Sequence, residues 1–148
     1  MSTRTKLLAA VAVLGVLVIL LARGGEPSAQ LQALEHDPMA SYEPPGGKLV
    51  DTDSQSEGTS LGKPVFARYT RMFELPPGTA EEALGHARAA ALAAGWAEVA
   101  SEEGVFAADK TLPTGGGQLG ITVFRDARIL PRDVRPPALQ VNLRHRGE

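Results

Sequence analysis

The feature that most constrains this chain is an uninterrupted apolar run near its start, from Leu7 to Ala22. None of its sixteen residues carries a charge or a strongly polar group. As a helix rising about 1.5 Å per residue it would extend roughly 24 Å, against roughly 30 Å for the hydrocarbon core of a bilayer. Lys6 and Arg23 flank the run, and long basic side chains bury their stems while their charge stays at the interface. The run therefore predicts a transmembrane segment within residues 1–25.

Three interpretations of this segment stay open. A retained signal anchor gives a single-pass protein of the cell membrane, whereas a cleaved signal peptide releases a secreted protein. Ala22 and Gly24 would occupy the small-residue positions of a cleavage site. A helix buried in a globular core is the third alternative. Arg4 and Lys6 favour a cytoplasmic N-terminus, so we expect the C-terminal bulk of the chain outside the membrane.

The composition narrows the possible function classes. Cysteine is absent from the sequence, which excludes disulfides, thiolate metal ligands and a cysteine nucleophile. A formal net charge of −2 gives no overall attraction to nucleic acid. Residues 125–148 nevertheless hold six arginines and three acids. They predict either an ion-paired, solvated surface or a partner-binding strip made by Arg125, Arg128, Arg132 and Arg135.

Residues 26–64 are predicted to be a linker. Ser28 is a helix-capping residue and predicts a short helix at 29–36, with Leu31 and Leu34 on one side. A helix this short needs a membrane surface or a partner to persist. From Pro38 to Pro64, twelve of twenty-seven residues are Pro, Gly or Ser, without strand or helix periodicity. As a coil this stretch would reach about 30 Å and would hold the following domain clear of lipid headgroups.

Residues 65–148 are predicted to form one small domain. Apolar side chains alternate from Val65 to Leu75, which indicates a strand. Thr79 and Glu82 have the spacing of a capping box, and the alanine-rich helix that they open ends at Gly95. Further strands are expected at 96–100, 105–112, 119–123 and 139–143, with an open loop at 113–117. The fold class is α+β: one helix packed on a four- or five-stranded, antiparallel-rich sheet.

The glycine-rich and acidic motifs do not predict a cofactor or a metal. Residues 115–120 match G-x-G-x-x-G, but a strand follows where the phosphate-binding motif needs a helix, so we expect a hairpin loop. Asp51, Asp53 and Glu57 resemble the start of a calcium loop but lack its glycine and its final glutamate.

Single residues of chemical interest are expected to be structural. His36, His86 and His145 have no ligand-type partner at metal-binding spacing and are expected on the surface. Trp96 is expected to pack back onto the preceding helix, the alternative being a ligand-stacking residue. We expect no enzymatic activity. A concave pocket gathering Glu98 or Asp109 with an arginine, together with a strongly shifted pKa, would instead indicate an enzyme.

The layout resembles the uncharacterised membrane-anchored envelope proteins of high-GC Gram-positive bacteria. The residues that suggest it are DPMASYEPPGG at 37–47, EGTSLGKP at 57–64 and AAGW at 93–96. The resemblance implies an N-terminal membrane segment, a Pro/Gly-rich spacer and a small α+β domain in the cell envelope. It implies no activity and assigns no functional residue.

Two functional hypotheses follow from location and layout. The first is a membrane-tethered extracytoplasmic binding domain that contacts another envelope protein through a sheet face or edge. The second is an accessory or regulatory subunit of a membrane complex, in which the span itself packs against other helices. Ala9, Ala12 and Gly15 place small residues three apart, as helix packing in membranes favours.

Overall fold

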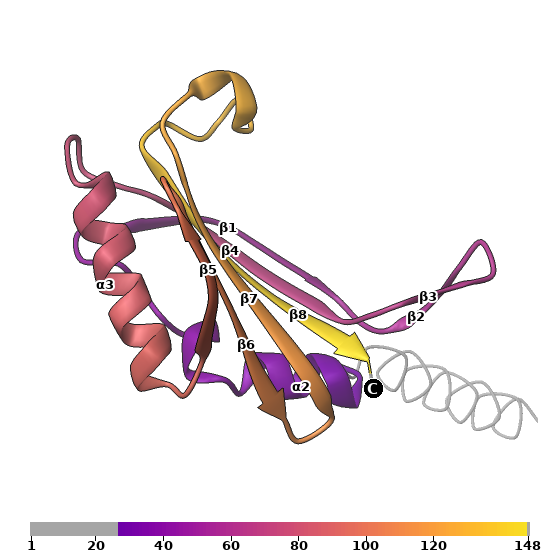
Figure 1. Cartoon of the computed structure of the whole chain (residues 1–148). Helices are drawn as coiled ribbons and strands as arrows, with labels where there is room; N and C mark the ends of the chain where they lie inside the picture. Colours follow the sequence, from indigo (N-terminus) through magenta and orange to yellow (C-terminus); the bar gives the residue numbers. More distant parts are fainter. Residues whose placement is uncertain (1–26, 148) are drawn as a thin grey trace, which may run out of the picture.

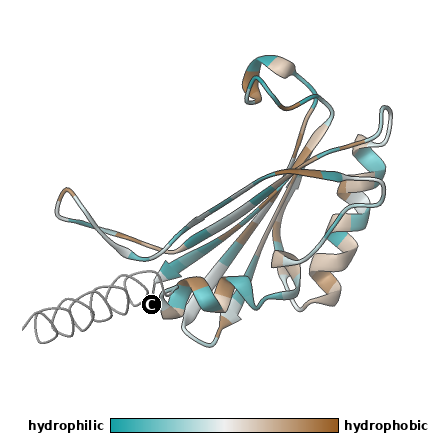
Figure 2. Cartoon of the chain, turned by 180° about the vertical axis from the view of Figure 1, so that it is seen from behind, coloured by the Kyte–Doolittle hydropathy of each residue, from teal (hydrophilic) through white to brown (hydrophobic). Residues whose placement is uncertain are grey.

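The strands of this chain form one large sheet with two helices on a single face (Figures 1 and 2). The computed structural model describes residues 27–147. The predicted transmembrane segment from Leu7 to Ala22 lies outside these residues. In chain order the helical elements are α2 (Ala29–Glu35), η1 (Pro38–Ala40), α3 (Ala80–Ala93) and η2 (Ala127–Ile129). The strands are β1 (Lys48–Gln55), β2 (Gly58–Ser60), β3 (Lys63–Val65), β4 (Arg68–Glu74), β5 (Ala97–Glu102), β6 (Val105–Leu112), β7 (Gly115–Phe124) and β8 (Ala138–Gly147).

The α+β class is confirmed, with more strands than expected. Six strands pair antiparallel in the order β1-β4-β8-β7-β6-β5, and β2 with β3 forms a separate hairpin. The sheet edges are β1 and β5, and each has a break in its pairing register, at Leu49/Asp51 and at Glu98/Ala100. The central strand β8 supplies the cleanest alternation in the sequence, burying Leu139, Val141 and Leu143 on one face.

The prediction of a linker at 38–64 is wrong. This stretch forms η1, the edge strand β1 and the β2–β3 hairpin. Seven of the eight residues of β1 are exposed, so the strand has almost no buried face and no apolar alternation to reveal it. Its order comes from backbone pairing with β4 along the whole strand. A polar, turn-rich sequence at a sheet edge therefore looks like a spacer.

The predicted short helix is confirmed as α2, but its stabilising partner is the sheet. The Ser28 hydroxyl accepts a hydrogen bond from the Leu31 N–H and so caps the helix. Leu31 and Leu34 are buried in the core, where α2 lies against β4 and β8. The folded domain therefore includes α2 and starts near Ser28 rather than at residue 65.

Helix α3 matches its predicted position and its alanine face, but not its predicted cap. Ala83, Ala87 and Ala91 are buried and let the helix lie close to the sheet. The Thr79 hydroxyl donates to the Pro76 carbonyl at 2.7 Å instead of accepting a helical N–H, so the capping box does not form.

The glycines at 115–117 belong to β7 rather than to a loop. Their strand pairs with β6 on one side and β8 on the other, and the turn comes before it, at Pro113 and Thr114. A Cβ atom on Gly117 would lie 2.8 Å from the Leu112 side chain and 3.2 Å from Trp96. Close packing against the core therefore requires glycine at this position.

The two faces of the sheet differ in how they are covered. The face under α2 and α3 holds the main core, with Trp96, Phe73 and Phe106 as its largest buried side chains. The opposite face is covered at one end only, where Leu130 and Val134 of the loop at 125–137 pack on Met72 and Ala138. The rest of that face, which we call the open sheet face, carries polar and small side chains.

Candidate functional site

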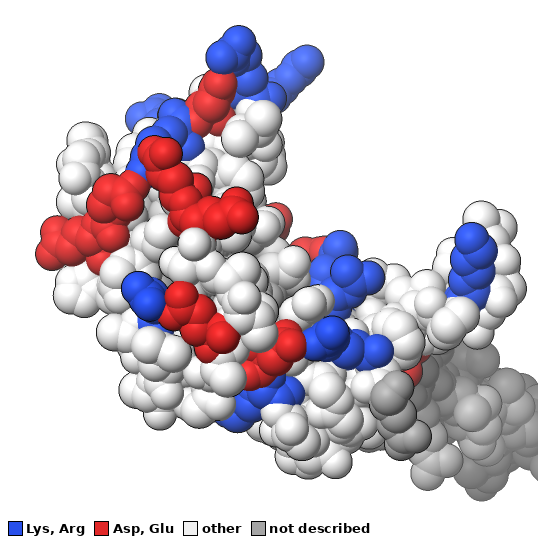
Figure 3. Space-filling model, in the orientation of Figure 1, with Lys and Arg blue, Asp and Glu red and all other residues white. Residues whose placement is uncertain are grey.

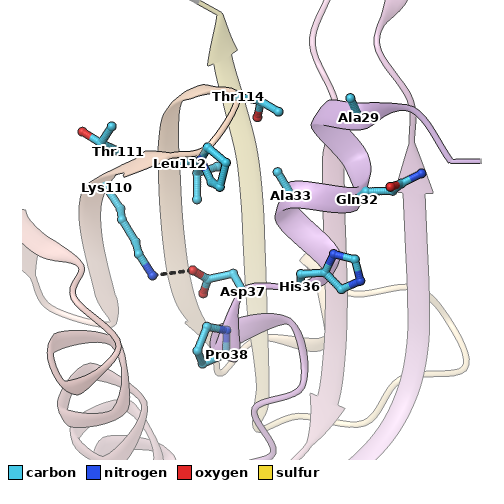
Figure 4. A pocket seen from close by; sticks show the side chains of 11 residues that line it. Ala29, Gln32, Ala33, His36, Asp37, Pro38, Lys110, Thr111, Leu112 and Thr114 are labelled. Atoms are coloured by element: carbon cyan, nitrogen blue, oxygen red, sulfur yellow. Dashed lines mark hydrogen bonds and ion pairs between the residues drawn. The ribbon is translucent and has the colours of Figure 1, made fainter.

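A buried carboxylate ties α2 to the sheet (Figure 4). Asp37 follows α2 and is 5% exposed. Its Oδ1 accepts from the Trp96 indole N–H at 3.0 Å and from the Met39 N–H at 2.9 Å. Its Oδ2 accepts from the Lys110 ammonium at 2.7 Å. Trp96 is thus buried and hydrogen-bonded within the core, where its ring is not available to stack on a ligand.

A shallow groove of about 400 Å³ lies between α2 and the β6–β7 turn, with this carboxylate at its floor (Figure 4). Lys110 lines the groove with 24% of its side chain exposed. Its ammonium also donates to the Ala94 carbonyl at 2.7 Å. The Lys110 ammonium therefore already has a carboxylate and a carbonyl as partners. These contacts hold three segments of the chain together, and we call them the Asp37 lock.

The three histidines lie in separate places. His36 is exposed at the groove, and His86 faces Glu82 on α3 at 3.5 Å. His145 is buried, so the expectation that it lies on the surface is wrong. Its Nδ1 accepts from the Gly147 N–H at 3.0 Å, which places the ring proton on Nε2, directed at the Thr114 hydroxyl 3.0 Å away. Within residues 27–147, no three His, Asp or Glu side chains gather as a metal site.

The arginine-rich strip lies on a loop that projects from the body and gathers basic side chains (Figure 3). Arg125 forms ion pairs with Glu81 and Glu103, and Arg128 with Asp126 at 2.8 Å. The hydrogen bonds from Arg128 lower the pKa of Asp126. Arg132 and Arg135 are exposed, and neither guanidinium forms an ion pair among the described residues, although the Arg135 backbone N–H donates to Glu74 at 2.9 Å. Half of the predicted strip is thus ion-paired and half is open to a partner.

The open sheet face has a second basic centre, which the sequence analysis did not single out. Arg68 on β4 lies directly opposite Arg144 on β8. Arg68 pairs with Asp53 at 2.7 Å, whereas Arg144 has no ion pair among the described residues. Like charges at directly opposite positions destabilise a sheet. The arrangement therefore leaves one guanidinium available to an external anion.

Two hollows of about 330 and 170 Å³ meet at this centre. Both are lined by Asn142 and Arg144, and Asn142 accepts from the Thr70 hydroxyl at 3.2 Å. Beside them Gly120 has open space where a side chain would point, so a partner's backbone can approach closely. The sequence does indicate part of this site, because the alternation of β8 predicts that Asn142 and Arg144 lie on its solvent-facing side.

The two acids that would indicate an enzyme lie on different sides of the sheet: Asp109 is on the open sheet face, in one cross-strand row with Gln118 and Arg144, whereas Glu98 faces α3. Glu98 pairs with Arg88 on α3 at 2.6 Å, and Asp109 pairs with Arg146 on β8 at 2.5 Å. Asp109 and Arg146 line a hollow of about 380 Å³, and each of the two acids is ion-paired with a single arginine.

Comparison with protein-family models, curated proteins and solved structures gave no match for this chain. Within residues 27–147, no helix has the length and apolarity needed to cross a bilayer.

Proposed function

We propose that this chain is a membrane-tethered extracytoplasmic interaction domain that binds an acidic segment of another envelope protein on its open sheet face. The observation that carries the proposal is the pairing of Arg144 with Arg68 across two central strands, with a carboxylate partner for Arg68 alone. A carboxylate from a partner protein would give Arg144 the ion pair that Arg68 already has. Charge-assisted hydrogen bonds to a guanidinium are among the stronger polar contacts available at a protein interface.

The shape of this face supports a protein partner rather than a small molecule. The two hollows are shallow and adjoin flat sheet made of small residues such as Gly120 and Ala107. Gln118, directly opposite Arg144 on β7, and Asn142, two residues before it on β8, add amide groups beside the arginine. Together they offer a surface on which a peptide backbone can find hydrogen bonds while its acidic side chain reaches the arginine.

The location belongs to the same proposal. The run from Leu7 to Ala22 supplies a membrane span, and Arg4 and Lys6 keep the N-terminus in the cytoplasm. The second hypothesis, an accessory subunit acting through the span, makes a different prediction. Replacing the span by an unrelated apolar one abolishes function only if the span itself packs against other helices.

Photocrosslinking in native membranes tests the binding face. A benzophenone amino acid in place of Gln118 should capture a reproducible protein neighbour, whereas one in place of Glu82 on α3 should not. Arg144→Glu should abolish the capture, because the partner's acid would then face a like charge. Arg132→Glu is the matched control on the arginine-rich loop. Loss of capture with Arg132→Glu but not with Arg144→Glu would move the site to the loop.

A further inference from the structure

The absence of a spacer changes where the domain must lie. The described chain starts at Pro27, and α2 begins at Ala29. From Ala22 to Pro27 there are five residues, which span at most about 18 Å when fully extended. A domain attached to the proposed span is therefore held against the membrane surface rather than clear of it. This consequence, and the inference drawn from it, rest on the proposed tethering.

The β2–β3 hairpin leaves the domain at the point where the chain enters it. The Ser28 hydroxyl, just before α2, donates a hydrogen bond to the Glu57 carboxylate. Glu57 is followed at once by β2. At the other side of the base, the Phe66 ring lies so close to Gly147 that a Cβ there would be 2.7 Å away. The base of the hairpin is thus fixed beside the entry of the chain, while its tip projects from the body (Figure 1).

The tip of the hairpin carries Leu61, which makes no buried contact in the fold. Ser60 pairs with Lys63, so Leu61 and Gly62 form a two-residue turn with φ of +51° and +76°. Turns with positive φ at both positions favour Asn-Gly, since leucine is strained there. Leu61 is the one positive-φ residue other than glycine in the described chain, and it is 100% exposed. An apolar side chain is thus held fully in water, in an unfavourable backbone geometry.

The reach of the hairpin matches the distance to the lipid. Four residues separate Glu57 from Leu61, which is about 13 Å along an extended strand. The polar interface outside the hydrocarbon core is roughly 5–8 Å thick on each side. A tip about 13 Å from the entry point of the chain can therefore cross the headgroup layer. Lys63 beside it is exposed and can keep its charge among the headgroups.

We infer that the β2–β3 hairpin is a second membrane contact, in which Leu61 inserts into the leaflet that the proposed span crosses. A lipid occupant suits this tip better than a protein pocket because the neighbours of Leu61 are Ser60, Gly62 and Lys63, which form no apolar patch with it. Of the other exposed branched residues, Ile129 at 66% lies on the separate projecting loop (Figure 1), and Val99 at 57% lies on the edge strand β5. Two attachments fix the orientation of the domain on the membrane and so decide which way the open sheet face points.

Spin labelling of the full chain in liposomes tests this contact. Because the chain has no cysteine, Ser60→Cys gives a unique label beside an intact Leu61. The nitroxide at residue 60 should be several-fold more accessible to oxygen than to a water-soluble nickel complex. The same label with Leu61→Asn, which suits the turn, should become accessible to nickel. Arg132→Cys on the projecting loop is the control and should be accessible to nickel throughout.

The outcomes separate this inference from the proposed tethering. In one outcome, alkaline extraction leaves the chain in the membrane while the label at residue 60 is as accessible to nickel as the label at residue 132. That result refutes the hairpin contact and leaves the tether standing. If extraction removes the chain, the tether is refuted and the hairpin contact falls with it. In native membranes, protection of residue 60 from both reagents would place Leu61 in a protein contact and overturn lipid insertion.

Discussion

Replacing Asp37 by alanine should destabilise the domain by about 3–5 kcal/mol, the range for removing one partner of a buried ion pair. The carboxylate accepts three hydrogen bonds, from Trp96, Met39 and Lys110. Without it the buried indole N–H of Trp96 loses its acceptor, which costs about 1–3 kcal/mol. The Lys110 contact is a charge-assisted bond worth about 1.5–3 kcal/mol, partly recovered by water because its side chain is 24% exposed.

Urea denaturation followed by Trp96 fluorescence measures this change directly, since Trp96 is the only tryptophan. Asp37→Asn keeps an oxygen at Oδ1 and should lose clearly less stability than Asp37→Ala. Asp51→Ala, at an exposed position on the edge strand β1, is the matched control and should stay within about 0.5 kcal/mol of the wild type. A loss below about 1 kcal/mol for Asp37→Ala would refute the role of this carboxylate as a lock between α2 and the sheet.

Three further substitutions test separate features by the same measurement. Leu61→Asn should stabilise the chain by about 1 kcal/mol, because asparagine tolerates a positive φ better than leucine and no buried surface is lost. A lower stability would contradict the claim that Leu61 is strained. Gly117→Ala should cost about 1–3 kcal/mol because its Cβ would meet Leu112 at 2.8 Å, whereas Gly120→Ala meets open space and should be nearly neutral. Although burial opposes it, hydrogen bonds from Ser28 and two backbone N–H groups hold the pKa of Glu57 below its usual value. Stability from Glu57 is then present above about pH 4.3 and is lost as the pH falls through the lowered pKa, so Glu57→Gln should converge with the wild type only in acid.

Apart from β5, whose six residues are all exposed, the elements that sequence patterns identified have a buried face or a residue that caps or stops a helix. Strand β8 alternates cleanly because one side packs on the core, and α2 and α3 show capping or stop residues at their ends. Strand β1 escaped because it lies at an edge and is exposed on both sides. Arg71, which interrupts the alternation of β4, points into the helix-covered side and donates to the Ala40 and Tyr42 carbonyls.

The candidate site also has a part that local sequence patterns predict and a part that they do not. Arg144 could be placed on a wet sheet face from the alternation around it, but its position opposite Arg68 depends on a strand pairing that links residues far apart in the chain. The Asp37 lock joins three segments through contacts that span 59 and 73 residues. No local pattern encodes such contacts, because each partner alone is an ordinary polar or aromatic residue.

The register breaks in the two edge strands affect how neighbouring copies of this chain can contact one another. If the chain is tethered to a membrane as proposed, its copies are confined to a plane, where neighbours meet more often than in free solution. Straight, unpaired strands invite a neighbour to continue the hydrogen-bonded ladder. Here the border at β1 is kinked beside charged side chains and the border at β5 is kinked beside Glu98. These breaks disfavour continuation of the hydrogen-bonded ladder from one copy of the chain to the next.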